Sequence, residues 1–169
     1  MRVVQNFSRA GTVKIVCHIS QGLPELYEAC QAISNVALKV TKTVSDLNRE
    51  VADAEVFIVN GGMYTTEVAK TIKQCGNNLR WIQFSSSGID SPRLHGAPDG
   101  LTLTNAGDVW APTVAEHATA LLLGLARQVH RFERTRIAGD GSREVLSPLM
   151  FSIRGSTVVI VGLGAIGRE

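Results

Sequence analysis

The segment TVVIVGLGAIG, residues 157–167, restricts the choice of fold more than any other stretch of the chain. A β-branched run ends at Val161, and glycines follow at Gly162, Gly164 and Gly167. The run predicts a buried strand, and the glycine spacing predicts a tight turn that leads into a helix. This order opens a dinucleotide-binding unit; the alternative is an ordinary turn between a strand and a helix.

In a dinucleotide site each of the three glycines has its own task. Gly162 makes the tight turn, Gly164 lets the backbone approach the pyrophosphate, and Gly167 lets the new helix pack closely on its strand. The N–H groups at the start of the helix then hold the phosphates. The acidic residue that binds the ribose is expected about 20 residues further on, beyond Glu169, so NAD and NADP both stay open.

Upstream of this segment, short apolar runs alternate with helical patterns. Strands are predicted at residues 13–19, 39–43, 55–60, 79–84 and 101–104. Helices are predicted at residues 24–34, after Pro24, and near residues 66–75. Strands that alternate with helices predict an α/β fold, in which a parallel sheet is covered on both faces.

A long helix is predicted to begin at Pro112. Proline is favoured in the first turn of a helix, and Gly139 supplies a stop signal. The apolar residues that recur every three or four positions are Val114, Ala118, Leu121, Leu125, Val129 and Phe132. The expected organisation is therefore one α/β domain over residues 1–111, and a connecting helix with the start of a second domain over residues 112–169.

Composition narrows the possible partners and compartments. Hydrophobic residues make up 44% of the chain and the formal net charge is +2, with scattered Lys and Arg, so we expect a globular protein without a nucleic-acid stripe. Cys17, Cys30 and Cys75 lie far apart, which argues against a disulfide framework or a zinc site. The N-terminal segment lacks a signal-peptide core, and the longest apolar patch is too short to span a bilayer. These features predict a cytoplasmic protein without a membrane partner.

The sequence SSSGID, residues 85–90, follows a predicted strand. Open parallel sheets bind ligands at the carboxyl ends of their strands, where Ser87 and Gly88 could offer consecutive backbone N–H groups to an anion. A nucleophilic serine is disfavoured because the spacing is not G-x-S-x-G. A plain polar turn in which Asp90 caps a short helix remains an alternative. The sequence NGGM, residues 60–63, could line the same cleft or be only a turn.

Glu116 and His117 invite an acid–base interpretation. Adjacent helix positions point about 100° apart, so the two side chains do not converge on one proton. No second His follows one turn later, which excludes H-E-x-x-H metal chemistry. Structural roles are favoured, and no residue of the chain is assigned as catalytic or as a metal ligand.

Three blocks in order, LRWIQFSSSGID, LTLTNAGDVWAPTVAEHATALLLGLAR and IRGSTVVIVGLGAIGRE, resemble the D-isomer-specific 2-hydroxyacid dehydrogenases. The resemblance extends from about Asn78 onward. It implies a flavodoxin-like substrate domain followed by a Rossmann domain that holds NAD or NADP. It also implies reduction of a small 2-keto acid to a D-2-hydroxy acid, of the glyoxylate/hydroxypyruvate or phosphoglycerate type.

The resemblance also implies roles for individual residues. Ser87 and Gly88 match the loop whose amides receive the substrate carboxylate, and Thr113 matches a position that contacts the cofactor. The cofactor-binding turn then comprises Gly162, Gly164, Ala165, Ile166 and Gly167. The long helix would form part of the homodimer interface of the full-length enzyme.

The family's catalytic Arg, Glu and His follow the glycine motif, and no residue here aligns with them. The resemblance therefore implies that this chain is the N-terminal portion of such an enzyme and is inactive alone. The alternatives are a non-catalytic dinucleotide-binding or interaction module derived from the same fold, and another class of two-domain dehydrogenase, because fold alone does not choose among functions.

Overall fold

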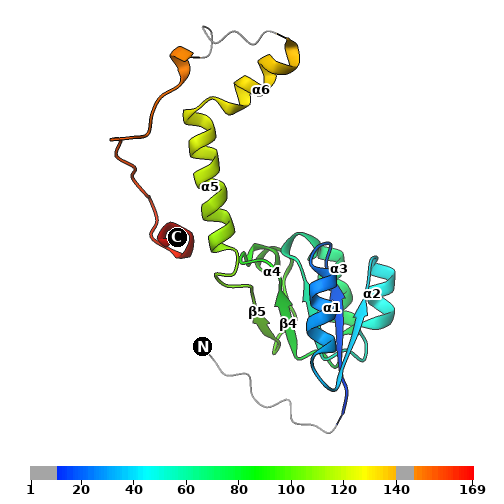
Figure 1. Ribbon diagram of the computed structural model, residues 1–169. Helices are drawn as coiled ribbons and strands as arrows, with labels where there is room; N and C mark the ends of the chain where they lie inside the picture. Colours follow the sequence, from blue (N-terminus) through cyan, green and yellow to red (C-terminus); the bar gives the residue numbers. More distant parts are fainter. Residues whose placement is uncertain (1–10, 140–146) are drawn as a thin grey trace. The chain divides into compact units, whose positions relative to one another are not determined.

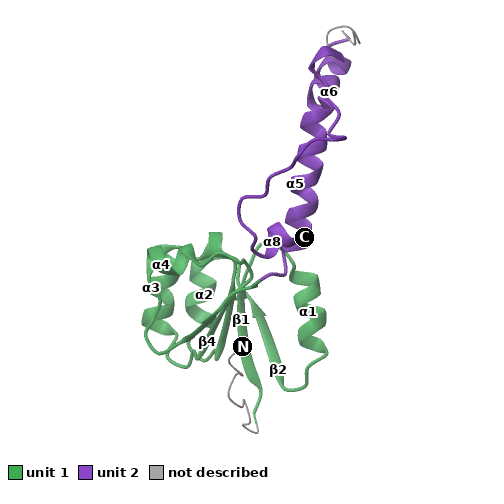
Figure 2. Cartoon of the chain, turned by 90° about the vertical axis from the view of Figure 1, so that its left-hand side faces the viewer, with its two compact units in different colours: residues 1–107 green, residues 108–169 purple. Residues whose placement is uncertain are grey.

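The computed structural model of the protein describes residues 11–139 and 147–169. The chain forms two compact units, Met1–Gly107 and Asp108–Glu169, which are coloured separately in Figure 2. The first unit holds the β-sheet, and the second is built from helices and extended segments.

A five-stranded parallel sheet forms the centre of the first unit, as Figure 1 shows in part. Its strands are β1 (Val13–His18), β2 (Val36–Val40), β3 (Val56–Val59), β4 (Trp81–Phe84) and β5 (Thr102–Thr104). Their spatial order is β2-β1-β3-β4-β5, the flavodoxin-like arrangement. The prediction of an α/β fold with a parallel sheet is confirmed.

Helices cover both faces of this sheet. Figure 2 shows α1 on one face and α2, α3 and α4 on the other. The helical elements of the unit are α1 (Leu23–Gln31), α2 (Val44–Glu50), the short η1 (Gly61–Met63), α3 (Thr66–Cys75) and α4 (Asp90–His95). Thr43 and Thr65 cap α2 and α3 by accepting hydrogen bonds from the N–H groups of Asp46 and Val68. Such caps satisfy N–H groups that have no partner within the helix.

The main core lies between the sheet and the α2–α3 layer. Parallel pairing places Phe57 beside Ile82, and Val59 beside Phe84, on one face of the sheet. All four side chains are fully or almost fully buried. The same buried cluster contains Leu47 of α2, Val51 directly after α2, and Val68 and Ile72 of α3. Truncating a buried aromatic side chain to Ala typically costs about 3–5 kcal/mol, so Phe57 and Phe84 contribute substantially to the stability of the unit.

Of two elements predicted for the first unit, one is confirmed and the other lies at different residues. The helix predicted near residues 66–75 is α3, Thr66–Cys75. The strand predicted at residues 39–43 lies earlier, at Val36–Val40. Its position is determined by pairing with β1, from Val13 opposite Val36 to Cys17 opposite Val40, and this long-range register is not visible in the local sequence.

The prediction of a single long helix is wrong for the second unit. The structure has two helices there, α5 (Ala111–Ala126) and α6 (Val129–Ala138). Between them Gln128 adopts a left-handed φ of 53°. The freed carbonyls at the end of α5 find other donors: Gln128 Nε2 donates to Leu125 O at 2.9 Å, and Phe151 N donates to Ala126 O at 3.0 Å. The apolar repeat continues across the break, so periodicity alone did not reveal it.

The predicted strand at residues 157–161 is also corrected. The segment belongs to no ladder in the described part of the chain, and Val161 is 96% exposed. A parallel strand requires hydrogen-bonded neighbours, and none of the described residues supplies them. The rest of the unit contains η2 (Ser147–Leu149) and α8 (Ala165–Arg168), and α8 packs against α5. No helix in the described part of the chain combines the length and apolarity that a bilayer crossing requires.

Candidate functional site

The loops that follow β3 and β4 lie in direct contact at the carboxyl edge of the sheet. Ser91 Oγ donates a hydrogen bond to Gly61 O at 2.5 Å, and Ser86 Oγ lies 2.8 Å from where a Cβ would stand on Gly61. Ligands of open parallel sheets bind at this edge. The structure therefore brings the NGGM and SSSGID segments together, as one of the two interpretations of NGGM requires.

The Ser87 side chain and carbonyl hold the loop in place. Ser87 Oγ donates to Gly107 O at 2.6 Å, and Ser87 O accepts from Asn105 Nδ2 at 2.6 Å. Neither contact involves a general base, so the hydroxyl serves the loop conformation and is not activated as a nucleophile.

The backbone N–H groups of Ser87 and Gly88 donate no hydrogen bond to any described residue. Both residues are exposed, so these donors are open to a ligand from solvent. Neither residue has a positive φ, so the alternation of right- and left-handed residues that forms an anion nest is absent here.

The alternative in which Asp90 caps a helix is wrong in detail. The N-cap of α4 is Ile89, and no side chain caps this helix. Asp90 is the first helical residue, where a carboxylate still interacts favourably with the helix dipole.

The order of the strands locates a candidate ligand-binding position that the sequence did not indicate. The order in which the chain adds strands reverses between β1 and β3. Ser20 N, after β1, donates to Asn60 Oδ1, after β3, at 3.2 Å. His18, 4% exposed at the end of β1, has its Nδ1 3.0 Å from Thr41 Oγ1. This reversal is where open α/β sheets bind ligands, but only the strand order locates it.

The three glycines of the turn in the second unit differ in what a side chain would meet. Gly162 has a φ of +104°, which side chains rarely adopt, and a Cβ on Gly164 would meet open space. A Cβ on Gly167 would collide with Gly162 O. The helix α8 begins at Ala165 directly after the turn. The strand that the sequence predicts before this turn is not formed.

The remaining site residues of this unit lie on α5. Thr113 is exposed in its first turn, and its hydroxyl forms no hydrogen bond with a described residue. Glu116 and His117 are exposed on the same helix and form no ion pair or hydrogen bond within the described ranges.

Neither the cysteines nor a cluster of metal-ligating side chains forms a further candidate site among the described residues. Cys17, Cys30 and Cys75 are free thiols. Burial raises the pKa of Cys17 to about 11, so its thiol stays protonated and unreactive near neutral pH. Within residues 11–139 and 147–169, no cluster of three His, Cys, Asp or Glu side chains could hold a metal ion.

The chain is similar in sequence to several known proteins. No protein-family model matches the chain. It is 30% identical over 135 residues to D-3-phosphoglycerate dehydrogenase from Archaeoglobus fulgidus, which covers 79% of this chain and 25% of that protein. It is 28% identical over 157 residues to hydroxypyruvate reductase from Thermotoga maritima, covering 90% of this chain and 49% of that protein. The chain thus spans about a quarter to a half of these curated relatives.

Solved structures agree on the fold. D-lactate dehydrogenase from Aquifex aeolicus, complexed with NAD and lactic acid, matches with a TM-score of 0.68 and 23% identity, over 90% of this chain and 46% of that one. NAD-dependent formate dehydrogenase from Staphylococcus aureus, in complex with NAD, matches with a TM-score of 0.66 and 18% identity, over 92% and 51%. At these identities the likeness concerns the fold. The sequence relatives and the solved structures consistently include proteins named as D-isomer-specific 2-hydroxyacid dehydrogenases or their individual enzymes, and the chain is similar to them over most of its length.

Proposed function

We propose that this chain provides the substrate-carboxylate loop and the first cofactor contacts of an NAD(P)-dependent oxidoreductase that interconverts small 2-keto acids and D-2-hydroxy acids. The observation that carries the proposal is the pair of uncommitted N–H groups of Ser87 and Gly88 at the carboxyl edge of the sheet. The names of the relatives, D-3-phosphoglycerate dehydrogenase and hydroxypyruvate reductase, support the substrate class.

In this proposal the two amides bind the substrate carboxylate. Backbone N–H groups donate to an anion in charge-assisted hydrogen bonds, which are stronger than neutral ones. The bonds from Ser87 Oγ to Gly107 O and from Asn105 Nδ2 to Ser87 O hold the loop on both sides. The carboxylate then orients the keto carbon without any charged side chain from the loop.

The cofactor contacts come from the second unit in this proposal. Gly162, Gly164 and Gly167 form the turn over the pyrophosphate, together with Ala165 and Ile166 at the start of α8, and Thr113 contacts the cofactor from α5. A bound nicotinamide would supply or accept the hydride. We further propose that the full-length enzyme is cytoplasmic and homodimeric, with the exposed apolar residues of α5, such as Leu121 and Leu125, in the interface.

Residues 1–169 alone are proposed to be inactive. Hydride transfer needs a positioned general acid, and Glu116 and His117 are adjacent on an exposed helix surface and do not converge. The Arg, Glu and His that the family uses have no counterpart at matching positions of these residues.

The test separates binding from turnover. In the ¹⁵N-labelled chain, millimolar D-lactate or glyoxylate should shift the amide resonances of Ser87 and Gly88. NADH or NADPH with glyoxylate, hydroxypyruvate or pyruvate should show no oxidation above background. Gly88→Ala should weaken the carboxylate response, because the added methyl group crowds the amides while its nearest neighbour, Asp90 Oδ2, stays at 3.5 Å.

Gly124→Ala, whose new Cβ meets nothing within 4 Å on α5, is the matched control and should bind as the parent does. A parent chain whose Ser87 and Gly88 resonances ignore both acids would refute the carboxylate site. Turnover above that of the Gly88→Ala variant would refute the proposed inactivity, and unchanged resonances of residues 162–167 on adding NADH would favour a different cofactor site.

A further inference from the structure

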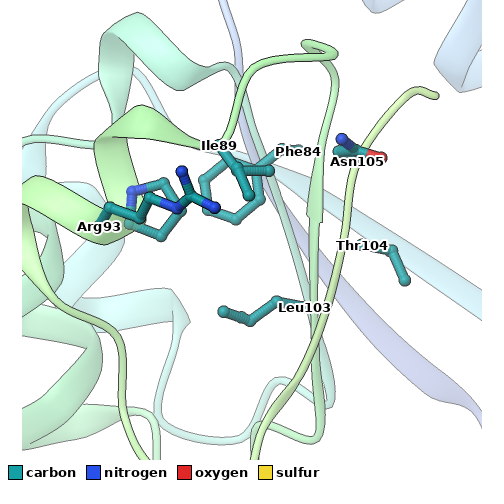
Figure 3. A pocket seen from close by; sticks show the side chains of 7 residues that line it. Phe84, Ile89, Arg93, Leu103, Thr104 and Asn105 are labelled. Carbon is teal, nitrogen blue, oxygen red and sulfur yellow. The ribbon is translucent and has the colours of Figure 1, made fainter. Parts of the chain in front are cut away.

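A pocket with about 400 Å³ of space lies between α4 and β5 in the first unit. Figure 3 shows its lining, with side chains from the end of β4, from α4 and the residue before it, and from β5. The residues are Phe84, Ile89, Pro92, Arg93, Leu103, Thr104 and Asn105. Pockets that bind small molecules commonly measure about 300–1,000 Å³, so the space is sufficient for a ligand.

The walls of this pocket are apolar. Phe84 is fully buried, whereas Ile89 and Leu103 remain 40% and 43% exposed. Figure 3 shows Leu103 extending from β5 toward α4 and Thr104 pointing the opposite way. Thr104 Oγ1 accepts from Trp81 Nε1 at 2.6 Å, so its hydroxyl does not serve the pocket.

The amide of Asn105 is also committed elsewhere. Its Nδ2 donates to Ser87 O at 2.6 Å, and its Oδ1 accepts from Gly107 N at 3.2 Å. The lining therefore offers large apolar surfaces with one uncommitted polar group, the guanidinium of Arg93.

Arg93 forms no ion pair or hydrogen bond with any described residue. Asp90 lies three positions earlier on α4, a spacing that permits a pair, yet the two do not form one. No acidic side chain lines the pocket. In Figure 3 the Arg93 side chain extends from α4 toward Ile89 and Phe84. A fixed positive charge beside apolar walls complements a ligand that carries one negative charge and an apolar body.

The geometry points to a binding site for a small amphipathic carboxylate, with its apolar chain or ring between Ile89, Phe84 and Leu103 and its carboxylate on Arg93. Ser87 and Gly88 are not among the residues that line this pocket, so the head-group position at Arg93 differs from the one at their amides. Guanidinium and carboxylate pair in a two-pronged geometry, which gives the head group a defined position. Burial of the apolar body against the apolar walls contributes the remaining affinity.

The inference can be tested with hexanoate, neutral hexanamide and acetate as probes. Titration of the ¹³C-methyl-labelled chain should give saturable shifts for the methyl groups of Ile89 and Leu103 with hexanoate. Hexanamide should bind roughly tenfold more weakly, because it lacks the charge that Arg93 recognises. Acetate lacks the apolar body and should bind most weakly.

Arg93→Gln should reduce the affinity for hexanoate roughly tenfold, to the level of hexanamide, and leave hexanamide unchanged. Arg131→Gln, which removes another exposed arginine from α6, is the matched control and should bind hexanoate as the parent does. Arg93 is exposed, so its replacement leaves the core intact.

Three results would overturn the inference. Non-saturable hexanoate shifts at Ile89 and Leu103 would mean that the pocket holds no ligand of this class. Shifts that instead concentrate on the leucines of α5 would indicate unspecific binding to an apolar helix. An equal loss of affinity in Arg93→Gln and Arg131→Gln would show that net charge, and not the pocket, attracts the carboxylate.

Discussion

At the scale of single residues, two glycines of the first unit have opposite structural constraints. A Cβ on Gly76, at the end of α3, would lie 2.7 Å from Ile72 O and 2.6 Å from Leu79 Cδ1. A Cβ on Gly62, in η1, would meet nothing within 4 Å. Backbone atoms do not move aside as the end of a flexible side chain does, so the first site penalises a methyl group and the second does not.

Gly76→Ala is therefore expected to lower the free energy of unfolding by roughly 1–3 kcal/mol, as overpacking does in well-packed sites. Gly62→Ala should change it by less than about 0.5 kcal/mol. Urea unfolding followed by circular dichroism measures both. Equal stabilities of the two variants would contradict the close contact at Gly76.

At the scale of elements, Lys14 joins β1 to the end of α2. Its Nζ lies 3.1 Å from Glu50 Oε2 and 2.6 Å from Asp53 Oδ1. Burial lowers the pKa of Lys14, but the hydrogen bonds to Asp53 and Glu50 outweigh it, so the pKa lies above its usual value. The hydrogen bond from Lys14 holds the pKa of Asp53 below its usual value.

These two shifts define a pH window for the stabilisation. The Asp53 contribution is present above the unfolded pKa of about 3.9 and is lost as the pH falls through the folded value. The Lys14 contribution is present below about 10.4 and is lost as the pH rises through its folded value. Lys14→Met should thus reduce stability between these limits, by roughly 0.5–1 kcal/mol because Asp53 exposes 70% of its side chain to screening solvent.

Urea unfolding at a series of pH values measures how far the unfolding midpoint of Lys14→Met differs from that of the parent chain. The control is Lys73→Met, which replaces an exposed lysine of α3. The difference should shrink toward the acid limit for Lys14→Met and stay near zero for Lys73→Met. A difference that persists unchanged below pH of about 3 would assign the effect to packing of the Lys14 stem and not to its charge.

At the scale of the whole molecule, the two units differ in how their backbone is paired. The strands β1, β3 and β4 each have two parallel neighbours, whereas residues 157–161 have no ladder partner in the described chain. Amide hydrogens of paired, buried strands exchange only when the structure opens, and unpaired exposed amides exchange freely.

Hydrogen exchange of the 169-residue chain should therefore protect Val16, Phe57 and Ile82 by orders of magnitude more than Val159 and Val161. Mass spectrometry of peptic fragments resolves these segments. Strong protection of residues 157–161 would mean that the segment has acquired a strand partner, and dilution of the sample would then distinguish a second copy from an intramolecular partner.

How far the sequence could predict the structure depended on the range of the interactions involved. The helix at Thr66–Cys75 was predictable because its cap, apolar spacing and terminal glycine are local signals. The break at Gln128 was not, since the apolar repeat continues across it and the residue that donates to Ala126 O, Phe151, lies 25 positions away. The Ser87 and Gly88 loop was predictable as a candidate, but its two holding contacts, with Gly107 and Asn105, depend on the end of β5.

By itself the sequence determined the class of fold, the glycine turn and the resemblance to the D-isomer-specific 2-hydroxyacid dehydrogenases, because strand and helix periodicity, backbone freedom and motif order are properties of neighbouring residues. The tertiary structure alone decided the strand order, the contact between the loops after β3 and β4, and the pocket beside Arg93. Each of these depends on which distant segments pair across the sheet. The same reason explains why TVVIV has the composition of a strand and yet forms none here: a β-strand exists only where another strand satisfies its backbone hydrogen bonds.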